Sequence, residues 1–144
     1  MTRLRTYVSL TQTERAVVLR SLALLPCVAV LVRTCGLARA TSVLARAARC
    51  VRAGPDALTP ADIARLVNAA ASLLGNHCLP RALVLWHFLR GRGTQAEVRV
   101  GVAKRPDGSL DAHAWVECDG IPVNQDEDVS LRFAPFGRAL PPGA

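Results

Sequence analysis

The hydrophobic pattern of this chain changes its period once, close to Gly93. Before that glycine, apolar residues recur at helical spacing in segments bounded by glycine and proline, which is typical of amphipathic helices. After it, in residues 96–102, alanine and valine alternate with polar residues or glycine, as in a half-buried β-strand. Helices followed by strands predict an α+β arrangement. A chain of 144 residues suffices for one domain with one hydrophobic core.

Capping residues and helix breakers divide the first part of the chain into four expected helices. Thr11 and Glu14 have the spacing of a capping box, and Thr59 followed by Pro60 is a second helix start. Pro26 predicts a kink or a restart inside the first helix. The expected helices cover residues 12–35, 37–51, 60–74 and about 80–90.

Turn residues divide the second part of the chain into three expected strands. Turns are predicted at residues 105–108 and at residues 119–120. The strands are expected over residues 96–102, 112–118 and 121–124, in an antiparallel meander. Residues 135–144 are rich in proline and glycine and are expected to form a flexible tail.

Composition narrows the classes of partner and the compartment. The net charge is +7, but the basic residues are scattered and are not interleaved with aromatic ones, so no nucleic-acid partner is expected. Five cysteines without a CxxC pair do not suit a secreted disulfide framework, and a reducing cytoplasm fits them better. The apolar uncharged run of residues 21–32 has 12 residues, fewer than the roughly 18 that a membrane span needs, so no membrane span is expected.

Cys78 differs from the other cysteines in its surroundings. It follows a helix stop at Gly75 and precedes a helix that begins at Pro80. Its sulfur should therefore lie near unpaired amide hydrogens at the positive end of a helix dipole, where a thiolate is favoured. For the same reason, its backbone amide is the natural candidate for an oxyanion donor.

His113 is the histidine that could serve Cys78 as a base. His77 is adjacent to the cysteine in sequence, so the two side chains diverge. His87 lies roughly two and a half helical turns further along. His113 belongs to the second expected strand, which could pack across the start of the helix, and Trp115 shares its strand face.

A third member of the site follows from the expected hairpin. If residues 119–120 form a two-residue turn, counting outward along the strands places Asp126 opposite His113, where a carboxylate can orient an imidazole. A three-residue loop would place Gln125 there instead. The register with Asp126 is the preferred alternative.

The order of cysteine, histidine and acidic residue resembles that of transglutaminase-like cysteine proteases. More narrowly, the chain resembles the lasso-peptide leader peptidases over about residues 76–129. The segments that carry this resemblance are CLPRALVLWHFLRGRG, EVRVGVAK and AHAWVECDGIPVNQDEDV. The resemblance implies a transglutaminase/papain-like core with Cys78 as nucleophile, His113 as base, and neither cofactor nor metal. Where the family usually has aspartate, this chain has Gln125, so either Asp126 serves or the glutamine orients the histidine as an amide.

The resemblance also implies a reaction and its partners. A thiolate would cut the bond between leader and core in a ribosomally made precursor peptide, and a lasso cyclase would act on the released core. Larger members of the family carry a leader-recognition domain, for which this chain has no room. The chain therefore resembles the peptidase half of a split B protein. This resemblance implies a separate leader-binding protein. The implied organisation is a helical region over residues 1–52, the peptidase core over 53–134 and the tail over 135–144.

Other uses of the same residues compete with this interpretation. A transglutaminase-like domain without activity could bind a peptide for other proteins, and an acyltransferase or amidase could use the same triad. A zinc site of His77, Cys78, His113 and Cys118 is disfavoured, because Cys118 points away from His113 in a regular strand and no two cysteines have ligand spacing. The cysteines other than Cys78 are expected to be buried and inert.

Overall fold

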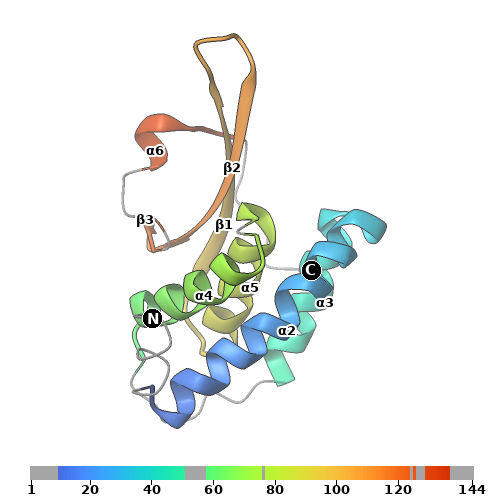
Figure 1. Cartoon of the computed structure of the whole chain (residues 1–144), viewed down its shortest axis with the longest axis vertical. Coiled ribbons are helices and arrows are strands. Elements are labelled where there is room, and N and C mark those ends of the chain that lie inside the picture. The colour runs from blue at the N-terminus through green and yellow to red at the C-terminus, as the bar shows by residue number, and fades with distance from the viewer. Residues whose placement is uncertain (1–9, 51–57, 76, 124, 126–128, 137–144) are drawn as a thin grey trace.

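The structure, a computed structural model, describes residues 10–50, 58–75, 77–123, 125 and 129–136. Among these residues, long helices precede an antiparallel sheet, which confirms the α+β class (Figure 1). The helices are α2 (Gln12–Cys35), α3 (Leu37–Cys50), α4 (Pro60–Leu73), α5 (Cys78–Gly91) and the short α6 (Val129–Arg132). The strands are β1 (Ala96–Lys104), β2 (Leu110–Cys118), β3 (Ile121–Pro122) and β4 (Ala134–Pro135).

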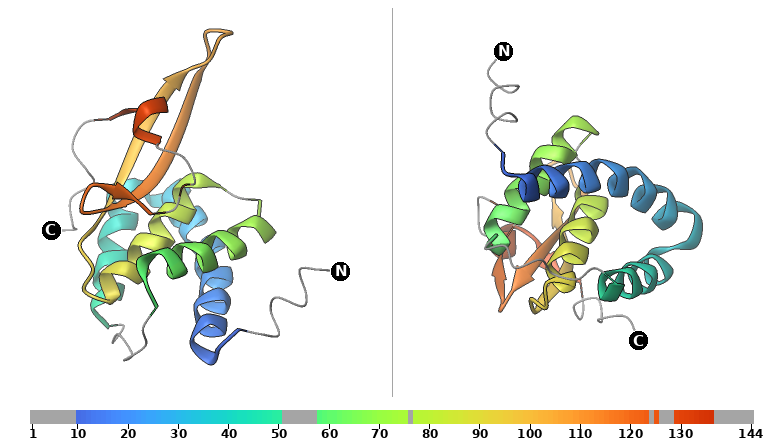
Figure 2. Two further views of the ribbon diagram at one scale, coloured as in Figure 1. Left: turned by 90° about the vertical axis from the view of Figure 1, so that its left-hand side faces the viewer. Right: turned by 90° about the horizontal axis from the view of Figure 1, so that it is seen from below.

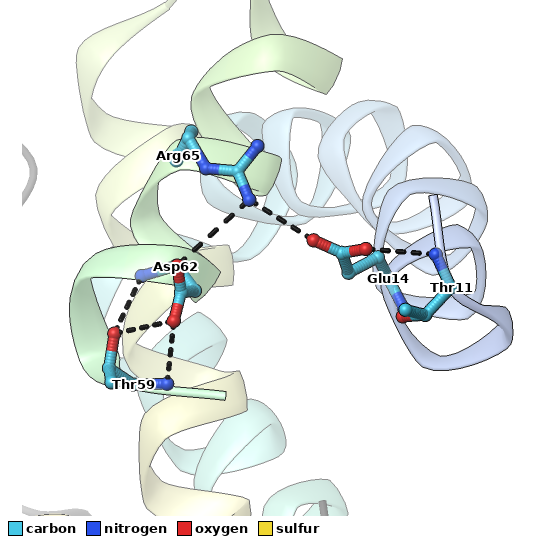
Figure 3. A network of polar contacts seen from close by, with 5 residues as sticks. All are labelled: Thr11, Glu14, Thr59, Asp62 and Arg65. Atoms are coloured by element: carbon cyan, nitrogen blue, oxygen red, sulfur yellow. Dashed lines mark hydrogen bonds and ion pairs between the residues drawn. The ribbon is translucent and has the colours of Figure 1, made fainter. Parts of the chain in front are cut away.

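Both helix starts predicted from capping residues are formed, and one arginine joins them. The Glu14 amide donates to the Thr11 hydroxyl at 3.2 Å, and the Thr11 amide donates to the Glu14 carboxylate at 2.9 Å. Thr59 and Asp62 repeat this capping box at the start of α4. The Arg65 guanidinium donates to Glu14 at 3.1 Å and lies 3.9 Å from Asp62 (Figure 3). The network therefore links the starts of α2 and α4.

The first helix is continuous, contrary to the kink or restart predicted at Pro26. α2 runs from Gln12 to Cys35 with the proline inside it, and Gly36 ends it with a positive φ of 79°. Pro26 is exposed, so the carbonyl group that lacks a helical partner can bond to water.

α2 is also the one helix in the described part of the chain that could cross a membrane by length and composition. An 18-residue window within it has a mean hydropathy of 2.0, and 28% of that window is buried inside the molecule. A core helix or an N-terminal signal sequence passes the same test, so the expected absence of a membrane span stays a prediction.

α5 is the central helix of the fold. All residues of 82–89 are buried, because α5 packs against α2, α3 and α4 as well as against β1 and β2. The Trp86 Nε1 donates to the Ala96 carbonyl at 3.0 Å, which ties the second half of α5 to the start of β1. The position of Cys78, at the other end of α5, is therefore set by the core.

The sheet has the order β3-β2-β1-β4. β1 and β2 pair from Ala96 with Cys118 to Lys104 with Leu110, and this hairpin projects beyond the helices (Figures 1 and 2). Asp119 has a φ of 52° and the following glycine a φ of 78°, as two-residue hairpin turns require. The predicted meander is thus formed, although β3 is shorter than expected.

The last described segment returns to the sheet, which the sequence does not predict. Pro135 of β4 pairs with Gly101, and the Phe136 amide donates to the Val100 carbonyl at 2.7 Å. Two residues of the expected tail are thus held against β1. A strand of two residues has no alternating pattern by which it could be recognised.

His87 makes the stability of the fold depend on pH. The residue is 5% exposed, and its Nδ1 lies 3.1 Å from the Leu44 carbonyl oxygen in α3. Burial lowers the pKa of His87 below its ordinary value, and the hydrogen bond to Leu44 opposes this in part. The unfolded chain therefore takes up a proton at higher pH than the folded chain. The contribution of the neutral His87 to the stability of the fold is complete above about pH 6.5 and is lost as the pH falls below this value.

We expect the free energy of unfolding to fall by roughly 1 kcal/mol between about pH 7.5 and pH 5.5. The fall should be smaller in His87→Gln, because this amide does not titrate and can still donate to the Leu44 carbonyl. Urea unfolding at three pH values measures both slopes. Equal slopes for the wild type and the variant would contradict the assignment to His87.

Candidate active site

Cys78 is the first residue of α5, two residues earlier than predicted. Pro80 does not delay the helix, because a proline is tolerated in the first turn. The N-cap residue His77 makes no side-chain cap bond. The backbone amides of Cys78 and Leu79 have no acceptor within the helix, so they can stabilise a negative charge that forms beside the sulfur.

The other cysteines differ from Cys78 and, in part, from expectation. Cys27, Cys35 and Cys50 are exposed rather than buried, and Cys118 is half-buried. Burial and the nearby Asp119 raise the pKa of the Cys118 thiol, which favours its protonated form. Within the described ranges, no group of three or more His, Cys, Asp or Glu is arranged to hold a metal ion.

His113 projects from the face of β2 that α5 does not cover. Ala114 and Val116 belong to the main core with α5, whereas Trp115 packs with Phe133 in a second cluster. The His113 ring stacks on Phe133 at 5.1 Å and 25°, and on Trp115 at 6.4 Å and 17°. The predicted sharing of one face by His113 and Trp115 is therefore confirmed.

Gly101 allows the close packing that supports this face. It pairs with His113 across the β1–β2 ladder. A Cβ at this position would lie 2.9 Å from Trp115 Cη2, 3.0 Å from the Ala134 carbonyl oxygen and 3.0 Å from Phe133 Cβ. Only a glycine leaves space for these groups, so this residue of β1 helps to fix the aromatic rings beside His113.

The surroundings of His113 favour its neutral form. Burial, the largest influence, lowers the pKa of His113 below its ordinary value of 6.5. A side-chain hydrogen bond with Gln125 raises the pKa, the charge of Arg81 lowers it, Asp111 raises it and Arg132 lowers it. The net effect is a lowered pKa, so the imidazole is neutral at neutral pH and can accept a proton.

The Nε2 atom of His113 is buried and has no hydrogen-bond partner among the described residues, and neither has the Nε2 atom of Gln125. The contact between the two side chains raises the pKa of His113, as an accepting amide oxygen would. The Cys78 thiol is not bonded to the His113 Nε2 in this structure. Catalytic hydrogen bonds often form only once substrate is bound.

Arg81 connects the surroundings of Cys78 with those of His113. It lies one turn after the cysteine on α5 and is half-buried. Burial lowers the pKa of the Arg81 guanidinium, and the negative charge of Cys78 raises it. The charge of Arg81 in turn lowers the pKa of His113. Arg81 is therefore coupled electrostatically to each of the two groups, although Cys78 packs on the side of the sheet that α5 covers and His113 projects from the other side.

The third member of the site is described only in part. Cys118 pairs with Ile121, as the two-residue turn predicts, and continued pairing would place Asp126 opposite His113. Asp126 itself lies outside the described residues, so its role stays a prediction. Gln125 is described, and its side-chain hydrogen bond acts on the imidazole.

Comparison with known proteins identifies a family but no individual relative. The profile of the transglutaminase-like superfamily matches residues 22–138, from the middle of α2 past β4. No curated protein and no solved structure matches the chain. This superfamily usually carries catalysis of the cysteine-protease kind. Because the match covers most of the 144 residues, the chain belongs to the transglutaminase-like superfamily.

Proposed function

We propose that the chain is a cysteine peptidase that removes the leader from a ribosomally synthesised lasso-peptide precursor. The observation that carries the proposal is the position of Cys78 at the start of α5, with Arg81 one turn later on that helix acting electrostatically on both Cys78 and His113 of β2. The superfamily match supports a thiol-dependent reaction. The motifs around the cysteine and the histidine resemble those of lasso-peptide leader peptidases and support the substrate class.

The proposed reaction begins with proton transfer from the Cys78 thiol to the His113 imidazole. The thiolate then attacks the carbonyl carbon of the bond between leader and core, and the backbone amide of Cys78 stabilises the oxyanion. The imidazolium donates its proton to the leaving amine, which releases the core and leaves a thioester. Water, deprotonated by His113, hydrolyses the thioester and releases the leader.

The proposed peptidase acts in the cytoplasm with two other proteins. A separate leader-binding protein presents the precursor, and a lasso cyclase takes the released core. The proposal includes no cofactor, metal or nucleic acid.

A mass-spectrometric assay tests the function. The protein is incubated with a candidate precursor peptide and a candidate leader-binding protein. We expect two fragments whose masses add up to the precursor plus one water. Unchanged peptide that still binds would favour a non-catalytic peptide-binding module, a candidate that the unpartnered Nε2 of His113 keeps open. A gain of mass would indicate acyl transfer.

The two candidates for the third residue make different predictions. A carboxylate stabilises an imidazolium, whereas a neutral amide only orients the ring, so we expect a larger loss of cleavage rate in Asp126→Ala, of roughly 100-fold, than in Gln125→Ala. The glutamine contact raises the pKa of His113, so Gln125→Ala should also move the acidic limb of the kcat/KM profile to lower pH. The opposite ranking of rates would contradict the predicted register.

A further inference from the structure

An apolar pocket lies beside the start of α5, outside the groups used in the proposed reaction. Its volume is about 120 Å³, and Leu25, Pro26, Ala29, Leu74, His77 and Pro80 are among the residues that line it. The residues of α2 form one wall, and the end of α4 forms another. The pocket is part of the cleft between these two helices and the first turn of α5.

The pocket adjoins the proposed nucleophile. His77 is the N-cap of α5 and directly precedes Cys78, and Pro80 follows two residues later. A peptide whose carbonyl carbon reaches the Cys78 sulfur would therefore bring a neighbouring side chain close to these two lining residues. Leu74, at the rim, is 45% exposed, so the apolar wall is accessible from solvent.

We infer that this pocket binds an aliphatic side chain of the substrate peptide close to the bond that is cut, an inference that rests on the proposed function. Apart from His77, the residues named in the lining offer only hydrocarbon side chains. A charged or amide side chain would lose its hydration there without gaining partners. An engineered apolar cavity of about 150 Å³ in another protein holds benzene, so 120 Å³ suits valine or leucine but not tryptophan.

A peptide series tests the preference. Internally quenched octapeptides carry glycine, alanine, valine, leucine, tryptophan or aspartate at one position at a time on either side of the cleaved bond. We expect one position at which kcat/KM rises roughly 10-fold or more per added methylene from glycine to leucine, and falls for tryptophan and aspartate.

A pair of substitutions on α2 locates the effect. Ala29→Leu fills the pocket from a half-buried position in its lining, whereas Ala23→Leu adds the same atoms at an exposed position of the same helix outside it. We expect Ala29→Leu to shift the preference from leucine to glycine or alanine. Ala23→Leu should leave the preference unchanged, and circular dichroism confirms that both variants fold.

A binding measurement separates failure of the pocket from failure of the peptidase. The same peptides, labelled for fluorescence anisotropy, are titrated with Cys78→Ala. Tighter binding of leucine than of glycine peptides, lost in Ala29→Leu, supports the pocket even if nothing is cleaved. Cleavage that does not depend on the side chain at any position, or that Ala29→Leu reduces equally for all peptides, would overturn the pocket and leave the peptidase standing. Equal binding of all peptides without cleavage would overturn both.

Discussion

Cys78→Ala should lower kcat/KM for leader removal by at least about 10⁴-fold. The substitution removes the atom that forms the thioester, and no other described thiol lies at a helix start. The side chain is only partly buried, so folding should be retained. Liquid chromatography with mass spectrometry of the precursor measures the loss of both fragments.

Cys118→Ala is the matched control for this result. Cys118 is also half-buried and packs against the same core, but its raised pKa disfavours a thiolate. We expect its cleavage rate to stay within a few-fold of the wild type. Residual cleavage by Cys78→Ala, together with loss of cleavage in Cys118→Ala, would show that Cys78 is not the nucleophile.

Trp115→Ala should lower the free energy of unfolding by about 3–5 kcal/mol. The side chain is 1% exposed, and its ring fills the space over Gly101. Its Nε1 donates to the Glu117 carboxylate at 2.8 Å, and Arg99 binds the same carboxylate at 3.0 Å. Removal of the indole therefore leaves a cavity and deprives the half-buried carboxylate of one donor. Urea unfolding followed by circular dichroism measures the change.

Trp115→Phe separates the ring from its hydrogen bond. Phenylalanine keeps most of the apolar contact with Phe133 but cannot donate to Glu117. We expect a smaller loss, of about 1–2 kcal/mol. Because His113 stacks on the same ring, the alanine variant should also lose cleavage activity in the fraction that remains folded. Wild-type stability of Trp115→Ala would contradict the packing described for this face.

The parts of the fold that local chemistry determines could be predicted from the sequence. Thr11 and Thr59 each cap a helix with the acidic residue three positions later, and this pair works without distant contacts. The turn at Asp119 has the backbone conformation that its residue types favour. The change of period at Gly93 separates α5 from β1, as expected.

The parts that depend on distant contacts could not be predicted. Pro26 stays within a helix because the opposite side of α2 packs against α4 and α5. β4 forms because Pro135 meets Gly101, some thirty residues earlier in the chain, at a place where only a glycine leaves room. No pattern in residues 134–136 signals that meeting.

The candidate site divides in the same way. The location of Cys78 at a helix start and the shared face of His113 and Trp115 follow from local spacing, and the structure has both. The position of Arg81 near both the cysteine and the histidine depends on how α5 meets β2, so helical spacing alone cannot show it. A basic residue one turn after a candidate nucleophile was nevertheless visible in the sequence as a signal.

The enclosure of α5 by its neighbours limits how far the chain can be shortened. Leu25 and Val28 of α2, and Leu44 of α3, are each at most 5% exposed and complete the wall around α5. A version trimmed to residues 53–134 would present these sides of α5 to water and would tend to precipitate. The amino-terminal helices are thus an integral part of whatever unit is exchanged, fused or evolved in the laboratory.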